Sequence, residues 1–268
     1  MRIGFLGGDA RMRACAEGAL QKGHSVASLS SFGEGVCVPS IQELCAFCEL
    51  LVLPSPASRD GTLIAGTDIP FSRLPLSSHH AVFGGFMPKS WKTKGGYLYD
   101  CAESESFLLQ NAALTADGAI ATALSASGRA FFGTSIAVLG YGRIAKLLCA
   151  RLRGFGVPVT VYARRAEARS EARLYGLHAK PLSSHTVFSE EMIFNTVPEP
   201  VFEGTSAPSA RCAYDLGGGL PAVLPSPNGE GVRVVSMRGV PGVFAPTAAG
   251  EIILEELLRY IDHLASAP

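Results

Sequence analysis

A glycine-rich string at positions 140–145, Gly-Tyr-Gly-Arg-Ile-Ala, restricts the fold of this chain more than any other feature. It directly follows an apolar run at 136–139 and opens a helical stretch at 144–154. In such a strand–turn–helix unit, Gly140 permits the tight turn, Gly142 lets a ligand approach the backbone, and Ala145 allows close packing of helix on strand. The helix N-terminus then presents N–H groups and the positive end of its dipole to a phosphate. The string could be only a structural turn, but its context favours a dinucleotide-binding unit of the Rossmann type.

The residues after the second strand of this unit indicate which dinucleotide binds. A domain specific for NAD places Asp or Glu about 20 residues after the motif, where the carboxylate binds the ribose 2′-hydroxyl. This chain instead has Tyr-Ala-Arg-Arg at 162–165. An arginine matches a 2′-phosphate in charge and in bidentate geometry, although the two arginines could also be a solvated basic pair. The missing carboxylate is a second argument, and the sequence predicts NADP (NADPH/NADP⁺) as the cofactor.

Two further strands are expected to end at the same edge of the sheet. One ends in Asn-Thr-Val-Pro at 195–198, and the next ends in Asp-Leu at 215–216, followed by three glycines that would let the nicotinamide ring come close. Either could be only a turn, but ligands of open α/β sheets bind at this carboxyl edge. The predicted cofactor-binding residues are Gly140, Tyr141, Gly142, Arg143, Ile144, Ala163, Arg164, Arg165, Thr196, Val197, Pro198, Asp215 and Leu216.

Strand-like and helical stretches alternate in both halves of the chain, which is typical of α/β domains with parallel sheets. Apolar runs at 2–6, 50–53 and 80–83 alternate with helical stretches at 12–22 and 41–48. The fold class we predict is α/β, with two doubly wound parallel-sheet domains, the second a Rossmann NAD(P)-binding domain, and a C-terminal helix that packs back toward the first. The predicted boundaries are 1–110 for the substrate domain, 111–128 for a hinge helix stopped by Gly128, 129–246 for the Rossmann domain and 247–268 for the last helix.

Composition narrows the classes of partner. Lys plus Arg and Asp plus Glu both number 23, so no charge excess points to nucleic acid or a membrane surface. No apolar run is long enough for a membrane span. The seven cysteines are scattered and no secretory segment precedes them, so we expect reduced thiols in a cytoplasmic protein. Cys45 and Cys48 could form a redox or metal motif, but nothing completes such a site, so buried thiols and no metal are predicted.

The two-domain layout resembles that of the D-2-hydroxyacid dehydrogenases, but two chemical groups of that family have no counterpart. The resemblance implies an Arg after the strand that ends at Asp215, and a Pro-His element shortly before the last helix. Glycines occupy 217–219, and Thr247 follows Pro246. Because Thr247 cannot exchange a proton near neutral pH as His does, hydroxyacid oxidation is disfavoured.

The order of several short motifs is similar, nearly end to end, to that of the A-chain family of dipicolinate synthase from spore-forming bacteria. The resemblance implies oxidation of dihydrodipicolinate to dipicolinate, a small dicarboxylate substrate, and the flavoprotein-like B chain of the synthase as partner. We also expect a homo-oligomer. The chain departs from the family's Pro-Thr-Ala-Glu-Gly pattern with Leu-Thr-Ala-Asp-Gly at 114–118. Besides the Rossmann turn and the two strand ends above, the matching segments are 7–11, 54–56, 115–120, 239–242 and 245–250.

The reaction that the resemblance implies requires a planar dianion held against the nicotinamide more than it requires a strong acid/base pair. Arg11 and Arg238 are the candidate anchors, although either could be a solvated surface residue. Ser55 and Thr115 could add neutral hydrogen-bond donors.

The residue that accepts the proton stays open between several candidates. Asp9 or Asp117 could accept it, and Asp9 could equally orient Arg11. The pair His79-His80 could be a base or part of a loop at a strand edge.

Two other functions compete with this one. The chain could be a non-catalytic NADP-binding scaffold or sensor, because the resemblance implies a partner chain. It could also be a reductase of the shikimate or alanine dehydrogenase type, which shares the Asn-Thr-x-Pro strand end, although we find no convincing Lys–Asp pair of the shikimate type in the first domain.

Overall fold

The structure is a computed structural model of the 268-residue chain, and it describes residues 1–29, 35–92, 96–127, 130–200, 206–207, 209–225 and 231–266. The chain divides into two compact units. Unit 1 comprises Met1–Asn111 and Ala245–Pro268, and unit 2 comprises Ala112–Phe244. Within the described ranges, no helix has both the length and the apolar character that a membrane crossing needs.

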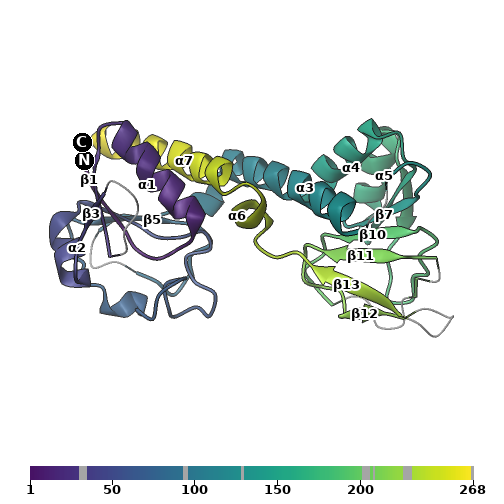
Figure 1. Cartoon of the computed structure of the whole chain (residues 1–268), viewed down its shortest axis with the longest axis horizontal. Coiled ribbons are helices and arrows are strands. Elements are labelled where there is room, and N and C mark those ends of the chain that lie inside the picture. Colours follow the sequence, from purple (N-terminus) through teal and green to yellow (C-terminus); the bar gives the residue numbers. More distant parts are fainter. Residues whose placement is uncertain are drawn as a thin grey trace. The chain divides into compact units, whose positions relative to one another are not determined.

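Unit 1 is built on a six-stranded sheet in which every neighbouring pair of strands is parallel (Figure 1). Side chains alternate between its two faces, so that Ile3 and Phe5 enter one core cluster and Leu6 enters the other. Two short 3₁₀ helices, η1 (Phe71–Arg73) and η2 (Cys101–Glu103), lie in its connections. The strand order is β3 (Val36–Cys37), β2 (Ser25–Ser28), β1 (Arg2–Phe5), β4 (Leu50–Val52), β5 (Ala81–Gly84) and β6 (Leu98–Asp100).

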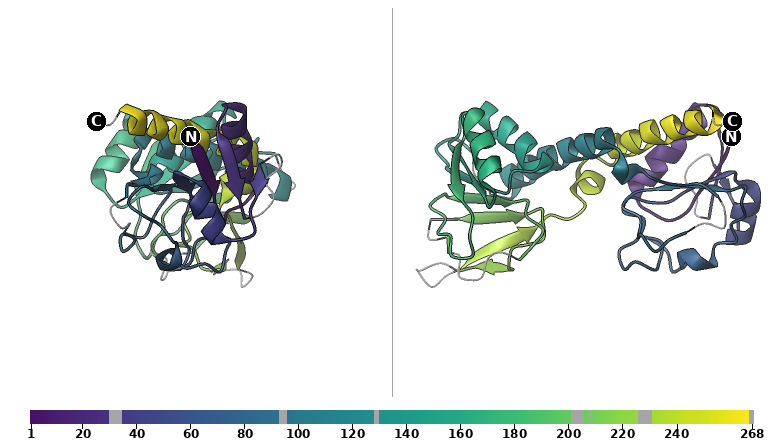
Figure 2. Two further views of the ribbon diagram at one scale, coloured as in Figure 1. Left: turned by 90° about the vertical axis from the view of Figure 1, so that its left-hand side faces the viewer. Right: turned by 180° about the vertical axis from the view of Figure 1, so that it is seen from behind.

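The last helix of the chain, α7 (Pro246–Ser266), lies beside the first, α1 (Ala10–Gln21), in unit 1 (Figures 1 and 2). Gly18 faces the Leu254 side chain, and a methyl group at Gly18 would overlap it. The Tyr99 hydroxyl donates a 2.6 Å hydrogen bond to the Glu256 carboxylate, which gives this buried carboxylate a hydrogen-bond donor. The prediction that the C-terminal helix returns to the first domain is confirmed.

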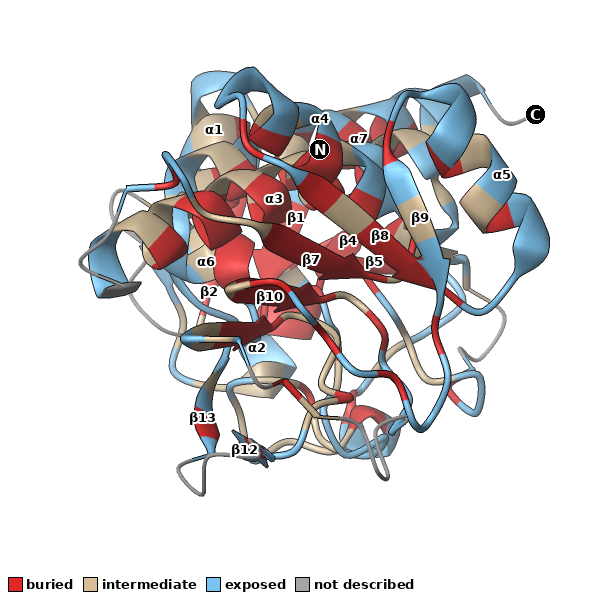
Figure 3. Cartoon of the chain, turned by 90° about the vertical axis from the view of Figure 1, so that its right-hand side faces the viewer, coloured by how far each residue is buried: buried red, intermediate tan, exposed pale blue. Residues whose placement is uncertain are grey.

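Unit 2 contains a seven-stranded sheet that is parallel except for its edge strand β12. Its central strands are buried along their whole length, whereas the outer faces of the flanking helices are exposed (Figure 3). The strand order reverses between β7 and β10, and such a switch point is where open α/β sheets bind ligands. The order is β9 (His178–Pro181), β8 (Val159–Ala163), β7 (Ile136–Leu139), β10 (Met192–Asn195), β11 (Cys212–Asp215), β13 (Val232–Ser236) and β12 (Val223–Leu224).

Among the described residues, the helices that lie wholly within unit 2 are α4 (Arg143–Gly154), α5 (Ala166–Leu174) and the short α6 (Val240–Phe244). The predicted strands and helices of both halves are present, and the α/β fold with two doubly wound sheets is confirmed.

The long helix α3 (Glu105–Ser127) contributes residues to both units, and the boundary between them falls inside it, after Asn111. Phe107 packs in the core of unit 1, whereas Ala116 and Ala123 pack in the core of unit 2. Packing therefore assigns 112–127 to the Rossmann unit rather than to a separate segment. The predicted stop at Gly128 lies outside the described residues, and a hinge in or beside α3 stays a prediction.

Cys45 and Cys48, at the end of α2 (Ile41–Phe47), are free and buried, as are most of the seven thiols. Burial raises the pKa of Cys45 to about 11 and that of Cys48 to about 12, so both are protonated at neutral pH. The thiols therefore pack as small apolar groups.

Candidate functional site

The turn after β7 holds Gly140 in a conformation that only glycine adopts without strain, with φ of +90°. Its N–H donates a 2.8 Å hydrogen bond to the Tyr162 carbonyl at the end of β8. A methyl group at Gly140 would lie 2.6 Å from Thr196 Oγ1, which is itself fixed by a 2.8 Å bond to the Leu139 carbonyl. Gly140 is thus required by the packing of the protein itself.

Gly142 differs, because a methyl group there would meet no atom within 4 Å. It is the N-cap residue of α4, and as a glycine it has no side chain with which to cap that helix. A helix start without a side-chain cap keeps backbone donors for a ligand, and open space above it admits a pyrophosphate. The turn therefore leaves room for a pyrophosphate, and dinucleotide binding there stays a prediction.

The side chain of Tyr141 belongs to the core rather than to the ligand edge. It is buried in the main cluster of unit 2 and lines a cavity of about 310 Å³ with Lys146 and Arg153. Burial raises its pKa to about 12. Only the backbone of Tyr141 is therefore placed to contact a cofactor. Of the next two residues, Arg143 is exposed and Ile144 is partly buried.

Asn195, which the sequence places in the Asn-Thr-Val-Pro strand end but not among the cofactor-binding residues, organises the loops after β10 and β11. It is fully buried, and its Nδ2 donates to Asp215 Oδ1 at 2.7 Å and to the Val197 carbonyl at 2.9 Å. Its Oδ1 accepts a 3.0 Å bond from the Val197 N–H. One amide thus fixes the Thr196-Val197-Pro198 segment.

Asp215 directs its carboxylate into its own loop. The carboxylate is buried and accepts hydrogen bonds from the N–H groups of Gly218 at 2.8 Å and Leu220 at 3.2 Å, in addition to Asn195. Gly217 and Gly219 pack directly on the carbonyls of residues 197 and 199, where a methyl group would overlap them. These glycines allow the two loops to pack closely. The Asp215 carboxylate holds its own loop, which begins at Leu216, in place at the carboxyl edge of the sheet.

Two arginines follow β8, where the sequence predicts the 2′-phosphate to bind. Arg164 Nη2 lies 2.6 Å from a carboxylate oxygen of Glu199, and Arg165 is exposed at the N-cap of α5. Arg169 donates to the carbonyls of Ala163 at 2.8 Å and of Arg164 at 2.6 Å, and so fixes the backbone of this turn. The side chains of Arg169 and Glu199 are functional candidates that the sequence did not reveal.

In unit 1, Asp9 and Arg11 form a pair at the start of α1. The Asp9 carboxylate accepts from Arg11 Nε at 2.9 Å, from Nη2 at 2.8 Å and from its backbone N–H at 3.0 Å. Desolvation raises the pKa of Asp9, but the hydrogen bonds and charge of Arg11 outweigh it and hold the pKa below its ordinary value. Asp9 therefore orients Arg11 and is a weak base.

Ser55 lies at the same edge of the unit 1 sheet. It is buried, and the Gly85 N–H donates a 3.1 Å bond to the neighbouring Pro54 carbonyl. Pro54 also lies beside Gly8, so the loops after β1, β4 and β5 meet. The Asp100 carboxylate accepts 2.8 Å bonds from the N–H groups of residues 86 and 87 and orders the third loop.

His80 lies at the opposite edge, because it precedes the first residue of β5. Its ring nitrogens contact Ser77 Oγ at 2.9 Å and the Cys45 carbonyl at 2.8 Å. Of the two interpretations left open for His79-His80, this geometry favours the loop at a strand edge.

Thr115 and Asp117 lie on α3, in unit 2. Thr115 is buried, and Asp117 forms an ion pair with Arg151 of α4. Asp117 thus helps to fasten two helices, which leaves it less available as a base than a free carboxylate.

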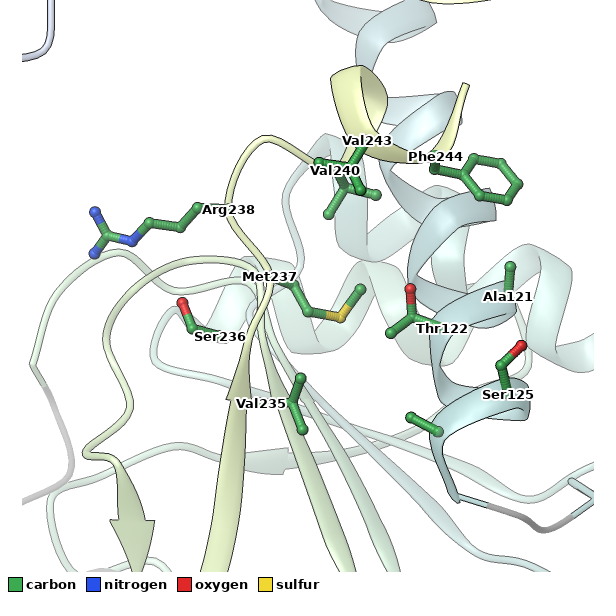
Figure 4. Close-up of a pocket in the computed structure, with 11 residues that line it drawn as sticks. Ala121, Thr122, Ser125, Val235, Ser236, Met237, Arg238, Val240, Val243 and Phe244 are labelled. Carbon is green, nitrogen blue, oxygen red and sulfur yellow. The ribbon is translucent and has the colours of Figure 1, made fainter. Parts of the chain in front are cut away.

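Arg238 follows β13 and lies beside Gly218 at the carboxyl edge. Among the described residues its guanidinium has no hydrogen-bond or ion-pair partner, and it is exposed. Arg238 is among the residues that line a groove of about 700 Å³, and Figure 4 shows its guanidinium directed away from Met237, which points toward Thr122 of α3. Within the described part of the chain, Arg238 is therefore an unpaired cation at the edge that the sequence predicts to be functional.

Comparison with known proteins agrees with this geometry. No family model matches the sequence. The A chain of dipicolinate synthase from Bacillus subtilis (strain 168) is 27% identical over 168 residues, which cover 59% of this chain and 56% of the relative. The match thus spans little more than half of the relative's length.

Solved structures extend the similarity to the whole fold. The dipicolinate synthase A chain from Bacillus subtilis has a TM-score of 0.74 at 19% identity, covering 99% of this chain and 97% of that one. Its counterpart from Bacillus halodurans has a TM-score of 0.76 at 17% identity, covering 100% and 98%. This chain resembles the dipicolinate synthase A chain. An L-alanine dehydrogenase has a TM-score of 0.59 at 14% identity, covering 99% of this chain and 90% of that one, so this chain shares its fold.

Proposed function

We propose that this chain is an NADP-dependent oxidoreductase that oxidises dihydrodipicolinate to dipicolinate. The observation that carries the proposal is the open space over Gly142, the glycine N-cap of α4, which has no side chain to cap the helix. Pyrophosphate oxygens would accept hydrogen bonds from the backbone there and gain from the helix dipole. The similarity to the dipicolinate synthase A chain directs the choice of substrate.

The basic turn after β8 supports NADP over NAD. Arg164 and Arg165 are both exposed, and no carboxylate stands in the turn between β8 and α5. Their guanidinium groups would bind a 2′-phosphate with charge-assisted hydrogen bonds.

A bound nicotinamide would supply the acceptor for a hydride from a ring carbon of the substrate. That C–H bond breaks with its electron pair, a second ring hydrogen leaves as a proton, and the dihydropyridine becomes an aromatic pyridine. Because aromaticity favours the product, the residues of the chain need mainly to orient a planar dianion. Each unit offers its own proposed carboxylate anchor and neutral donor: Arg11, oriented by Asp9, with Ser55 in unit 1, and Arg238, free of a protein partner among the described residues, with Thr115 in unit 2.

Proton release needs no dedicated base in this scheme. Asp9 and Asp117 are both ion-paired, and the pKa of Asp9 is lowered. We therefore assign the proton to solvent rather than to either carboxylate. This differs from hydroxyacid dehydrogenases, whose alcohol substrate needs a general base.

The direct test is an absorbance assay at the nicotinamide band with the purified full chain, freshly made dihydrodipicolinate and either NADP⁺ or NAD⁺. Reduction of NADP⁺ at the higher kcat/KM is expected. Arg164→Glu should weaken NADP⁺ binding at least tenfold while leaving NAD⁺ binding within about twofold. Tighter binding of NAD⁺ by the wild type, or unchanged NADP⁺ affinity in the variant, contradicts the cofactor assignment.

One observation favours a second function, an NADP-binding scaffold for a flavoprotein-like B chain. Both carboxylates predicted to accept a proton are engaged in ion pairs within the protein, which suits a chain that binds cofactor and leaves chemistry to a partner. If the isolated chain binds NADP⁺ but turns over only with the B chain added, the scaffold function is the correct one.

A further inference from the structure

The ion pair between Arg164 and Glu199 joins two loops that are not neighbours in the sheet. Arg164 follows β8 and Glu199 follows β10, and β7 lies between these two strands. The pair therefore spans the carboxyl end of β7, where the turn at Gly140 begins. A ligand that reaches from this turn toward β8 has to meet it.

Both partners are held at their backbones while their side chains stay accessible. Arg169 fixes the Arg164 carbonyl, and the Glu199 carbonyl packs on Gly219. The side chains are 54% and 61% exposed, so a ligand can reach the charges without unfolding either loop. Such an exposed pair contributes little to stability and is easily exchanged for another partner.

We propose that Glu199 is a specificity-determining residue that reduces the preference for a 2′-phosphate. This inference rests on the nicotinamide-binding function proposed above. The Glu199 carboxylate is ion-paired with Arg164 and repels a phosphate. A 2′-phosphate therefore has to displace this carboxylate to reach Arg164. A ribose 2′-hydroxyl can instead donate a hydrogen bond to Glu199, which supplies from β10 the carboxylate that the turn after β8 lacks.

The expected effect follows from the charges. Removing the carboxylate frees Arg164 and abolishes one repulsion, so Glu199→Gln should tighten binding of a 2′-phosphate by about threefold to tenfold at low salt. The increase should shrink at high ionic strength, since exposed charges are screened. Binding of a ligand without the 2′-phosphate should fall slightly or stay the same.

The experiment measures dissociation constants of 2′,5′-ADP and of 5′-AMP by calorimetry on the full chain. Glu191→Gln is the matched control, because Glu191 pairs with Arg211 at 3.1 Å ahead of β10, at the opposite end of the strand, and carries the same charge. The inference predicts tighter 2′,5′-ADP binding by Glu199→Gln alone, and Arg164→Gln added to it should remove the gain.

Equal affinities of wild type and Glu199→Gln for 2′,5′-ADP overturn the role of Glu199 and leave NADP binding intact. An equal gain in the Glu191→Gln control, or for 5′-AMP, also overturns it, since the effect is then one of net charge. Failure of the wild type to bind either ligand overturns the nicotinamide function itself, and the inference with it.

Discussion

Alanine at Gly140 should lower the stability of the protein, whereas alanine at Gly142 should weaken cofactor binding and leave stability nearly unchanged, although both glycines belong to one turn. At Gly140, alanine must adopt a φ of +90°, which costs about 1–2 kcal/mol. Its methyl group would also lie 2.6 Å from Thr196 Oγ1, and overpacking of this kind costs about 1–3 kcal/mol because the Thr196 hydroxyl is already bonded to the Leu139 carbonyl. Gly140→Ala should therefore lower the free energy of unfolding by about 2–5 kcal/mol.

At Gly142 the backbone has a φ of −89°, and a methyl group would meet no protein atom within 4 Å. Alanine restricts the unfolded chain, which stabilises the fold, but it is a poorer N-cap than glycine, which destabilises it. The two effects nearly cancel, so the free energy of unfolding should change by less than about 0.5 kcal/mol. The methyl group would, however, fill the space in which we place the pyrophosphate. NADP⁺ should then bind at least tenfold more weakly, a loss of about 1.4 kcal/mol.

Urea denaturation followed by circular dichroism and calorimetric titration with NADP⁺ measure the two effects separately. Gly154→Ala, in the last turn of the same helix and equally free of close neighbours, is the control and should keep wild-type affinity. Unchanged NADP⁺ affinity in Gly142→Ala, or equal destabilisation by the two substitutions, refutes the steric reasoning.

Three further substitutions test the supporting residues, and a fourth tests the placement of a histidine. Asn195→Ala removes three buried hydrogen bonds and should lower the free energy of unfolding by about 2–4 kcal/mol in urea titrations, and a loss under about 1 kcal/mol speaks against its organising role. Asp9→Asn removes a carboxylate whose pKa is lowered in the folded state. The stability that this carboxylate contributes is present at pH 7 and disappears as the pH falls below about 4. The unfolding free energies of wild type and variant should therefore differ at neutral pH and converge in acid. Arg11→Ala should raise KM for dihydrodipicolinate about tenfold or more in steady-state assays, and unchanged KM and kcat remove Arg11 from the site. His80→Ala should leave kcat unchanged, since His80 lies at the opposite sheet edge, and a large fall in kcat contradicts that placement.

The sequence was sufficient where one local pattern decides the structure. The run at 136–139 and the glycine string after it predict β7, the turn and α4, because each element depends on residues that are adjacent in the chain. Strands β2 and β3 escaped prediction, since Ser25–Ser28 and Val36–Cys37 are too short to show a period and pair only through the sheet.

The supporting residues could not be predicted, because their roles depend on partners distant in sequence. Asn195 acquires its role from Asp215, and Asp117 is engaged by Arg151 on another helix. Glu199 is an exposed acid in a loop, a position that carries no sequence signal until the fold brings it beside Arg164. The carboxyl edge of the sheet and the glycine turn were thus predictable from the sequence, whereas the ion-pair and hydrogen-bond partners of the charged residues were not.

A dinucleotide bound at the start of α4, as we propose, would link the survival of this protein to cofactor supply. A glycine N-cap stabilises a helix only about a few tenths of a kcal/mol less than a side-chain cap does, and it leaves the N–H groups of the first turn open to an anion. Ligand at about a hundred times its dissociation constant adds about 2.7 kcal/mol to the folded state. Newly made chains in a cell rich in the dinucleotide would thus resist proteolysis, whereas chains made during scarcity would be degraded several times faster. Measured abundance in vivo would then report on nucleotide status as well as on gene expression.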